Sequence, residues 1–211
     1  MFNFPSPQEL AIRIPVFLLA LTIHEFAHGW VANRLGDPTA RLQGRLTLNP
    51  LAHLDPIGTL AIVLIGFGWA RPVPVDARHL RNPQRDMMVI AAAGPLSNLV
   101  LAAGCAFAYM MVPWAMAGPD WAWLLVPVRL MLRAGVWANV ILAVFNLLPI
   151  PPLDGGRVVS GVLPLRQALG FSRLEPYGFL IIFLLFFTGI LDPVFGAAVR
   201  TLATALFRLW G

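Results

Sequence analysis

Residues 10–31 read LAIRIPVFLLALTIHEFAHGWV, an apolar stretch long enough to cross a lipid bilayer as a helix. Near its end it contains His24, Glu25 and His28. Two histidines four residues apart on a helix project from the same face, so both imidazoles can reach one metal ion. Glu25 beside them is a candidate base for an activated water, which completes the H-E-x-x-H zinc pattern. Hydrogen bonding between neighbouring helices is the alternative role for these polar side chains.

The composition of the chain indicates an integral membrane protein. Of its 211 residues, 58% are hydrophobic and 12% are charged, and the mean hydropathy is +0.75, a balance outside that of soluble domains. We expect a single domain over residues 1–211. The first apolar stretch carries the His-Glu pattern and no small-residue cleavage site follows it, so we expect a retained span and no signal peptide. Cys105 is the single cysteine, so we expect no disulfide.

Further apolar stretches lie at residues 87–112, 134–148 and 176–191, and a final segment reaches Trp210. Arg200 interrupts that final segment, which predicts either a short span or an interfacial helix. Residues 59–69 are apolar but too short to span, and their β-branched and glycine content favours a β-hairpin or a re-entrant segment at the membrane edge. The expected fold is an all-α bundle of four to five transmembrane helices with this one short membrane-edge element.

The loop charges predict the orientation. All 15 basic residues are arginines, and the net charge is +5. Seven arginines follow the first stretch and three follow the third, whereas Arg129 and Arg133 alone lie between the second and the third. Arginine-rich loops remain in the cytoplasm, so we expect the N-terminus outside, in a bacterial-type cell membrane, and His28 nearer the cytoplasmic face than His24. The basic excess indicates anionic lipid headgroups as partners and no nucleic acid.

A catalytic zinc ion takes three protein ligands and keeps one position open for water. Asp154 follows the proline-rich break after the third span, and the predicted orientation brings it to the same side of the membrane as His28. We therefore favour Asp154 as the third ligand. A turn or helix cap before Gly155-Gly156 is its alternative role.

Three segments together resemble the site-2 protease family of intramembrane zinc metalloproteases. They are HEFAHG at residues 24–29, AGPLSN at residues 93–98 and NLLPIPPLDGG at residues 146–156. The resemblance is to the compact form of the family, because the chain has no room for a PDZ domain or for nucleotide-sensing repeats. It also implies that residues 66–75 correspond to the family's membrane-edge strand region.

The resemblance implies cleavage of transmembrane substrates, with single-span membrane proteins as partners within the lipid bilayer. It implies one zinc ion held by His24, His28 and Asp154, Glu25 as the catalytic glutamate, and Asn146 as a polar residue that assists catalysis. Helix bonding by Asn146 stays open as an alternative.

Two other polar residues have less specific interpretations. Asn98 is interpreted as packing, since an amide can bond across a helix interface. His53 lies in a loop where it could gate the site or bind a second metal, although a structural role is the more common one for such a histidine.

Two other functions remain open from the sequence. The chain could be a membrane metal transporter or an inactive relative that binds helices. A transporter has no need of Glu25 beside the ligands, and it usually shows internal repeats, which are not found here. An inactive relative would lack the glutamate or a ligand, and neither is missing. These features favour a zinc endopeptidase.

Overall fold

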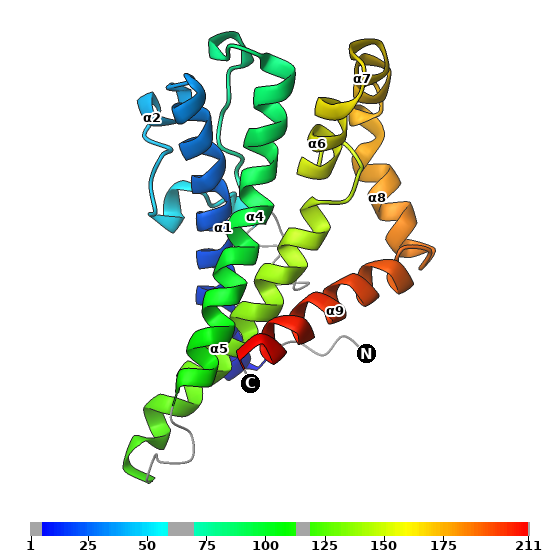
Figure 1. Cartoon of the computed structure of the whole chain (residues 1–211). Helices are drawn as coiled ribbons and strands as arrows, with labels where there is room; N and C mark the ends of the chain where they lie inside the picture. Colours follow the sequence, from blue (N-terminus) through cyan, green and yellow to red (C-terminus); the bar gives the residue numbers. More distant parts are fainter. Residues whose placement is uncertain (1–5, 59–69, 113–118, 211) are drawn as a thin grey trace.

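The structure, a computed structural model, describes residues 6–58, 70–112 and 119–210 (Figure 1). Four helices form its main body: α1 (Pro7–Leu35), α4 (Pro83–Met111), α5 (Pro119–Asn146) and α9 (Asp192–Trp210). Shorter elements connect them: α2 (Thr39–Leu42), η1 (Pro50–Ala52), η2 (Ala77–His79), α6 (Asp154–Val162), α7 (Leu165–Ser172), η4 (Glu175–Tyr177) and α8 (Gly178–Phe187).

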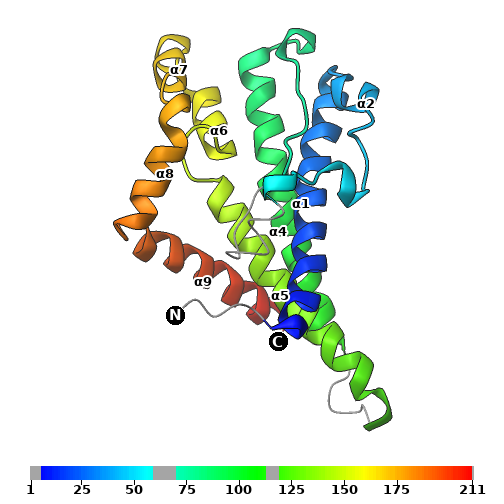
Figure 2. The same ribbon diagram turned by 180° about the vertical axis from the view of Figure 1, so that it is seen from behind.

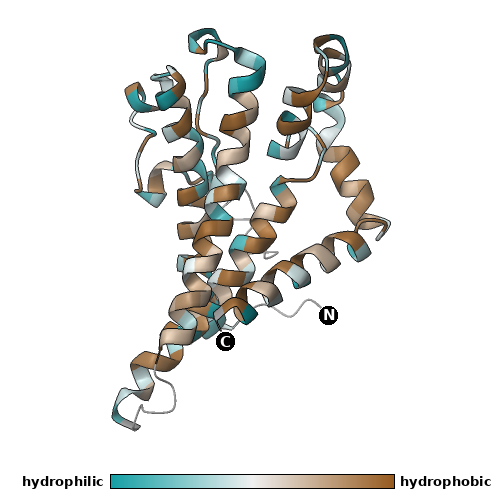
Figure 3. Ribbon diagram, viewed as in Figure 1, coloured by the Kyte–Doolittle hydropathy of each residue, from teal (hydrophilic) through white to brown (hydrophobic). Residues whose placement is uncertain are grey.

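Four helical stretches in the described part of the chain are long and apolar enough to cross a membrane. They are α1, α4, α5 from Asp120, and the stretch Leu165–Phe187 that contains α7, η4 and α8. Figure 3 shows hydrophobic residues along the middle of α1, α4, α5 and α8, and hydrophilic residues gathered near α2, the start of α4 and the tip of α7. The prediction of an all-helical membrane protein is confirmed, with four candidate spans.

The first span has clear chemical signals at both ends. The Ser6 hydroxyl accepts a hydrogen bond from the Glu9 N–H, and the Glu9 carboxylate accepts one from the Ser6 N–H, so two free donors of the first turn are satisfied. The helix ends at Gly36, whose φ of 112° is accessible to glycine without strain. These signals extend α1 beyond the apolar stretch at both ends.

The helices α1, α4 and α5 pack side by side, and α9 crosses against α4 and α5 (Figures 1 and 2). Small residues line the crossing, which lets the backbones approach closely. The fully buried members of this cluster are Ala102, Ala106, Val136, Val140 and Ala203. The final segment is therefore a helix against the bundle, and it is not among the four candidate spans.

The start of the third span and the structure of the segment after it differ from the sequence-based expectation. The third span begins at Pro119 rather than near residue 134, because Trp121 and Trp123 continue the same helix. Arg157 and Arg166, expected in a loop, lie in α6 and α7. Each of these helices is too short for a clear apolar repeat, and Pro164 separates them. The sequence pattern therefore predicts a loop.

The expected membrane-edge hairpin or re-entrant segment at residues 59–69 lies outside the described residues. On its flanks the structure shows an isolated antiparallel bridge between Leu54 and Ala70. The described residues contain no strand, and residues 71–76 follow the bridge without regular secondary structure. The β-hairpin part of the predicted fold therefore has no support from the described chain.

Candidate metal centre

Three side chains from distant parts of the sequence meet between α1 and the start of α6. His24 and His28 lie one turn apart on α1, and Asp154 is the first residue of α6. The two histidine Nε2 atoms are 3.0 Å apart. Oδ2 of Asp154 lies 3.2 Å from His24 Nε2 and 3.3 Å from His28 Nε2. The structure thus brings together the three residues that the sequence analysis grouped as zinc ligands, and all three are buried.

A network of buried amides fixes the His24 ring. The Asn98 Nδ2 group donates to the carbonyl of Ala20 at 3.1 Å and to Oδ1 of Asn139 at 2.8 Å, so its Oδ1 must face His24. That oxygen lies 2.6 Å from His24 Nδ1, which therefore carries the proton and donates it. The interpretation of Asn98 as packing was incomplete. The sequence did contain a signal for this role of Asn98, because an amide side chain is rare in an apolar span and lies here four residues after Gly94.

The His28 ring is held in the same way by the main chain. Its Nδ1 donates to the carbonyl of Ile90 on α4 at 2.7 Å. A carbonyl only accepts, so the proton sits on Nδ1 and Nε2 is left with a lone pair. Hydrogen bonds from the second ring nitrogen are the usual way in which proteins orient metal-binding histidines. Both Nε2 atoms therefore face the centre of the cluster as acceptors.

The turn before α6 positions Asp154. A Cβ atom at Gly155 would overlap the carbonyls of Leu147 and Leu148, and one at Gly156 would overlap Pro151. Only glycine allows α6 to start this close to the end of α5.

The cluster fits a zinc ion. The Oδ2 atom of Asp154 is buried without a hydrogen-bond donor among the described residues, and it faces the two Nε2 lone pairs. Three converging acceptors are unfavourable without a cation between them. Two ligand atoms bound to a tetrahedral zinc ion at about 2.0–2.1 Å lie about 3.3 Å from each other. The observed separations of 3.0, 3.2 and 3.3 Å match this geometry.

Gly94 on α4 makes room for the two imidazoles. A Cβ atom at this position would overlap Nε2 of His28 and Cε1 of His24. The AGPLSN segment thus contributes both an opening, at Gly94, and an acceptor for His24, at Asn98. This is the structural reason why a glycine occurs in the middle of a spanning helix.

Glu25 lies beside the cluster and is not part of it. Its side chain is buried, and its Oε2 accepts a hydrogen bond of 2.8 Å from the main-chain N–H of Val73. Its other oxygen, Oε1, has no hydrogen-bond donor among the described residues, and a carboxylate oxygen in this state can take up a proton. This placement is compatible with the expected role of Glu25 as a base.

Two other candidate residues have contacts away from the cluster. The side chain of Asn146 donates to the carbonyl of Leu142 in its own helix at 3.0 Å, so its catalytic role stays a prediction. His53 is almost fully buried, and its Nε2 lies 2.8 Å from the carbonyl of Thr47, to which it donates. This contact favours the structural interpretation of His53.

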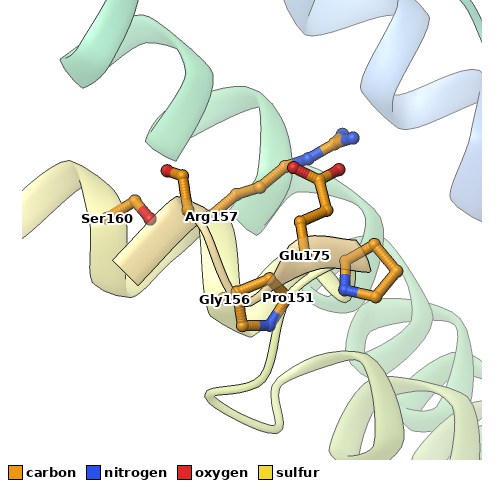
Figure 4. A pocket seen from close by; sticks show the side chains of 7 residues that line it. Pro151, Gly156, Arg157, Ser160 and Glu175 are labelled. Atoms are coloured by element: carbon orange, nitrogen blue, oxygen red, sulfur yellow. The ribbon is translucent and has the colours of Figure 1, made fainter. Parts of the chain in front are cut away.

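A small pocket lies behind the turn that carries Asp154, between α6 and η4 (Figure 4). It shares no residue with the cluster. The side chains of Arg157 and Glu175 stand over it in Figure 4. Its lining residues are Pro151, Pro152, Gly156, Arg157, Ser160, Ser172 and Glu175.

Comparison with known proteins assigns the chain to a family. The sequence profile of peptidase family M50 matches residues 123–189. A Bacillus subtilis protein named "Putative zinc metalloprotease YwhC" is 38% identical over 198 residues, which cover 90% of each chain. The chain belongs to peptidase family M50. The resemblance to the site-2 proteases is thereby confirmed. This chain is a zinc metalloprotease of family M50, with four helices in its described part that are long and apolar enough to cross a membrane.

Two further relatives support this assignment to M50. "Putative zinc metalloprotease Rip2" of Mycolicibacterium smegmatis is 31% identical over 191 residues, which are 85% of this chain and 68% of the relative. "Regulator of sigma-E protease RseP" of Escherichia coli is 32% identical over 116 residues, which are 49% of this chain and 25% of the relative. No solved structure matches the chain. Zinc is thus the cofactor that the family indicates for the His24, His28 and Asp154 cluster.

Proposed function

We propose that this M50 protein is an intramembrane endopeptidase that hydrolyses peptide bonds in the membrane segments of single-span proteins. The observation that carries the proposal is the buried cluster of two Nε2 lone pairs and one carboxylate, with Glu25 next to it on the same helix. The helix α1 that carries three of these residues is a candidate span. A protease site on a spanning helix is suited to substrates that also lie in the membrane.

In the proposed mechanism His24, His28 and Asp154 hold one zinc ion per chain. Zinc held there would lower the pKa of a water molecule and polarise the scissile carbonyl. Glu25 removes a proton from the attacking water through Oε1, the oxygen that does not bind the Val73 N–H, and delivers the proton to the leaving amine. Asn146 is proposed to donate to the oxygen of the developing oxyanion after a rotation away from the Leu142 carbonyl.

The orientation and the domain organisation are also proposals. The arginine-rich segments after α1 and around α6 and α7 favour a cytoplasmic location for this end of the bundle. The cluster then opens towards the cytoplasmic side of a bacterial-type cell membrane. Residues 1–211 are proposed to form one protease domain.

The test of the proposal uses purified protein and a panel of single-span substrates. Glu25→Gln keeps the size of the side chain and one acceptor oxygen but removes the base. We expect zinc content to stay at the wild-type level and kcat to fall by about 10² to 10⁴, the usual contribution of general-base catalysis. Glu175→Gln, an exposed glutamate outside the cluster, is the matched control and should cleave like the wild type.

The result also separates the rival functions. Full cleavage by Glu25→Gln would remove the protease mechanism. Zinc binding without any cleavage by the wild type would favour metal transport or helix binding.

A further inference from the structure

The segment 71–76 is fastened to α1 and to the loop after it by several side chains. The Arg45 guanidinium donates to the carbonyl of Arg71 at 2.7 Å and to that of Pro72 at 3.3 Å. At the far end, the Asp76 N–H donates to the buried Asp37 carboxylate at 2.7 Å. Between these two anchors lies the hydrogen bond from Val73 to Glu25. The segment is therefore held at both ends and in the middle.

Among residues 72–74 only Val73 has a main-chain N–H group. Pro72 and Pro74 lack an N–H group, and each proline also restricts its own backbone and that of the residue before it. The Pro-Val-Pro sequence thus presents a single N–H from a stiff backbone. In the structure that N–H points at Oε2 of Glu25.

The packing around Val73 fixes the direction of this donor. The Val73 side chain is buried, and its Cγ1 would lie 3.1 Å from a Cβ atom at Gly29, one turn after Glu25 on α1. Glycine at position 29 lets the segment approach the helix closely. Val73 therefore contacts α1 twice, through its side chain at Gly29 and through its N–H at Glu25.

A buried carboxylate needs at least one donor, because desolvation without a hydrogen bond is costly. The bond from Val73 supplies this donor and also removes the freedom of the carboxylate to rotate. We propose that the main-chain N–H of Val73 is the positioning group for Glu25: it holds Oε2 and so presents Oε1 to the reacting water. This inference rests on the proposed role of Glu25 as the base.

Hydrogen exchange of the Val73 amide tests the contact without any activity measurement. Among residues 71–74 only Arg71 and Val73 have an amide proton, so fragmentation of the peptide between these two residues assigns their exchange separately. Glu25→Gln keeps an oxygen acceptor and should leave the Val73 amide protected. Glu25→Ala removes the acceptor, so the Val73 amide should exchange faster. The Arg71 amide, which donates to the His53 carbonyl at 2.8 Å, is the internal control and should stay protected in both variants.

A backbone ester at Val73 tests the consequence for catalysis. Replacing the amide by an ester keeps the valine side chain and removes the N–H alone. We expect kcat to fall by roughly 10²-fold, the effect of a misplaced catalytic group, with KM and zinc content unchanged. The control is the same ester at Val75, whose N–H finds no acceptor among the described residues. The Val75 ester should have the kcat of the wild type.

The outcomes separate this inference from the proposed function. Equal protection of the Val73 amide in Glu25→Ala and in the wild type would overturn the contact. A wild-type kcat in the Val73 ester would overturn the positioning role while the protease proposal stands. If wild-type cleavage itself does not depend on Glu25, the proposed function fails, and the catalytic part of this inference fails with it.

Discussion

His24 donates from Nδ1 to Oδ1 of Asn98, 2.6 Å away on the neighbouring span α4. The amide that accepts this bond is itself tied to Ala20 and Asn139, so it cannot rotate without losing two other hydrogen bonds. The His24 ring is thereby held with Nε2 towards Asp154. The ligand geometry is consequently built by α4 and α5 as well as by α1.

Replacement of Asn98 by leucine should weaken zinc binding without removing it. Loss of a hydrogen bond that orients a ligand typically costs about 10- to 100-fold in metal affinity. Competition with a chelator of known affinity measures the effect. Val100→Ala, an exposed position on the same helix, should bind zinc like the wild type. Wild-type affinity in Asn98→Leu would show that the amide network does not position His24.

Gly94→Ala should abolish stoichiometric zinc binding while the helices remain folded. The added methyl group would occupy the space of the His24 and His28 rings. Zinc content and circular dichroism measure the two parts of this prediction. Gly104→Ala is the matched control on the same helix, because a Cβ atom there would have no neighbour within 4 Å. Both variants gain the same helix propensity, so any difference in zinc content comes from the site.

Sequence reasoning located the spans and the metal cluster because both depend on local patterns. Apolar length marks a spanning helix, and i, i+4 spacing places His24 and His28 on one face. Asp154 was predicted as the third zinc ligand because a catalytic zinc ion takes three protein ligands. Each of these arguments needs only residue types and their spacing.

The supporting contacts were not predictable in the same way. The bond between His24 and Asn98 joins residues 74 positions apart, and the bond between Val73 and Glu25 joins residues 48 positions apart. Such pairs depend on how the helices are rotated and offset, which periodicity does not determine. The helices α6 and α7 were missed because they are short and each follows a proline-containing turn.

Acid should destabilise the loop that follows α1. Asp37 is fully buried and accepts hydrogen bonds from Thr39, from the Asp76 N–H and from His79. Burial raises the pKa of this carboxyl, but the hydrogen bonds lower it by more, so its folded pKa lies below the ordinary value. Its contribution to stability is therefore complete above the unfolded pKa of about 4 and is lost as the pH falls further.

Thermal unfolding of the purified protein between neutral and acid pH checks this prediction. Asp37→Asn should be less stable at neutral pH by about 2 kcal/mol, the value of hydrogen bonds to a charged group, and should lose part of the acid dependence. Asp120→Asn changes an exposed aspartate at the start of α5 and should keep the wild-type profile. A steeper acid dependence in Asp37→Asn would contradict the assignment.

Cysteine labelling in intact cells tests the orientation. After Cys105→Ser removes the native thiol, single cysteines at Arg41 and Arg166 should be shielded from an impermeant reagent, because both positions lie at the end of the bundle expected in the cytoplasm. A cysteine at Trp123 should be labelled, because this residue lies near the start of α5, and that end of α5 is at the opposite end of the bundle (Figure 1). The reverse pattern would invert the topology and move the metal centre to the other side of the membrane.

Elemental analysis of zinc per chain tests most directly whether His24, His28 and Asp154 together bind one zinc ion. The wild type is measured in parallel with His24→Ala, His28→Ala and Asp154→Ala. We expect one zinc ion per chain in the wild type and far less than one in each variant, because two remaining ligands do not hold a catalytic zinc ion tightly. Stoichiometric zinc in the His24→Ala and Asp154→Ala proteins would contradict the account and place the metal elsewhere.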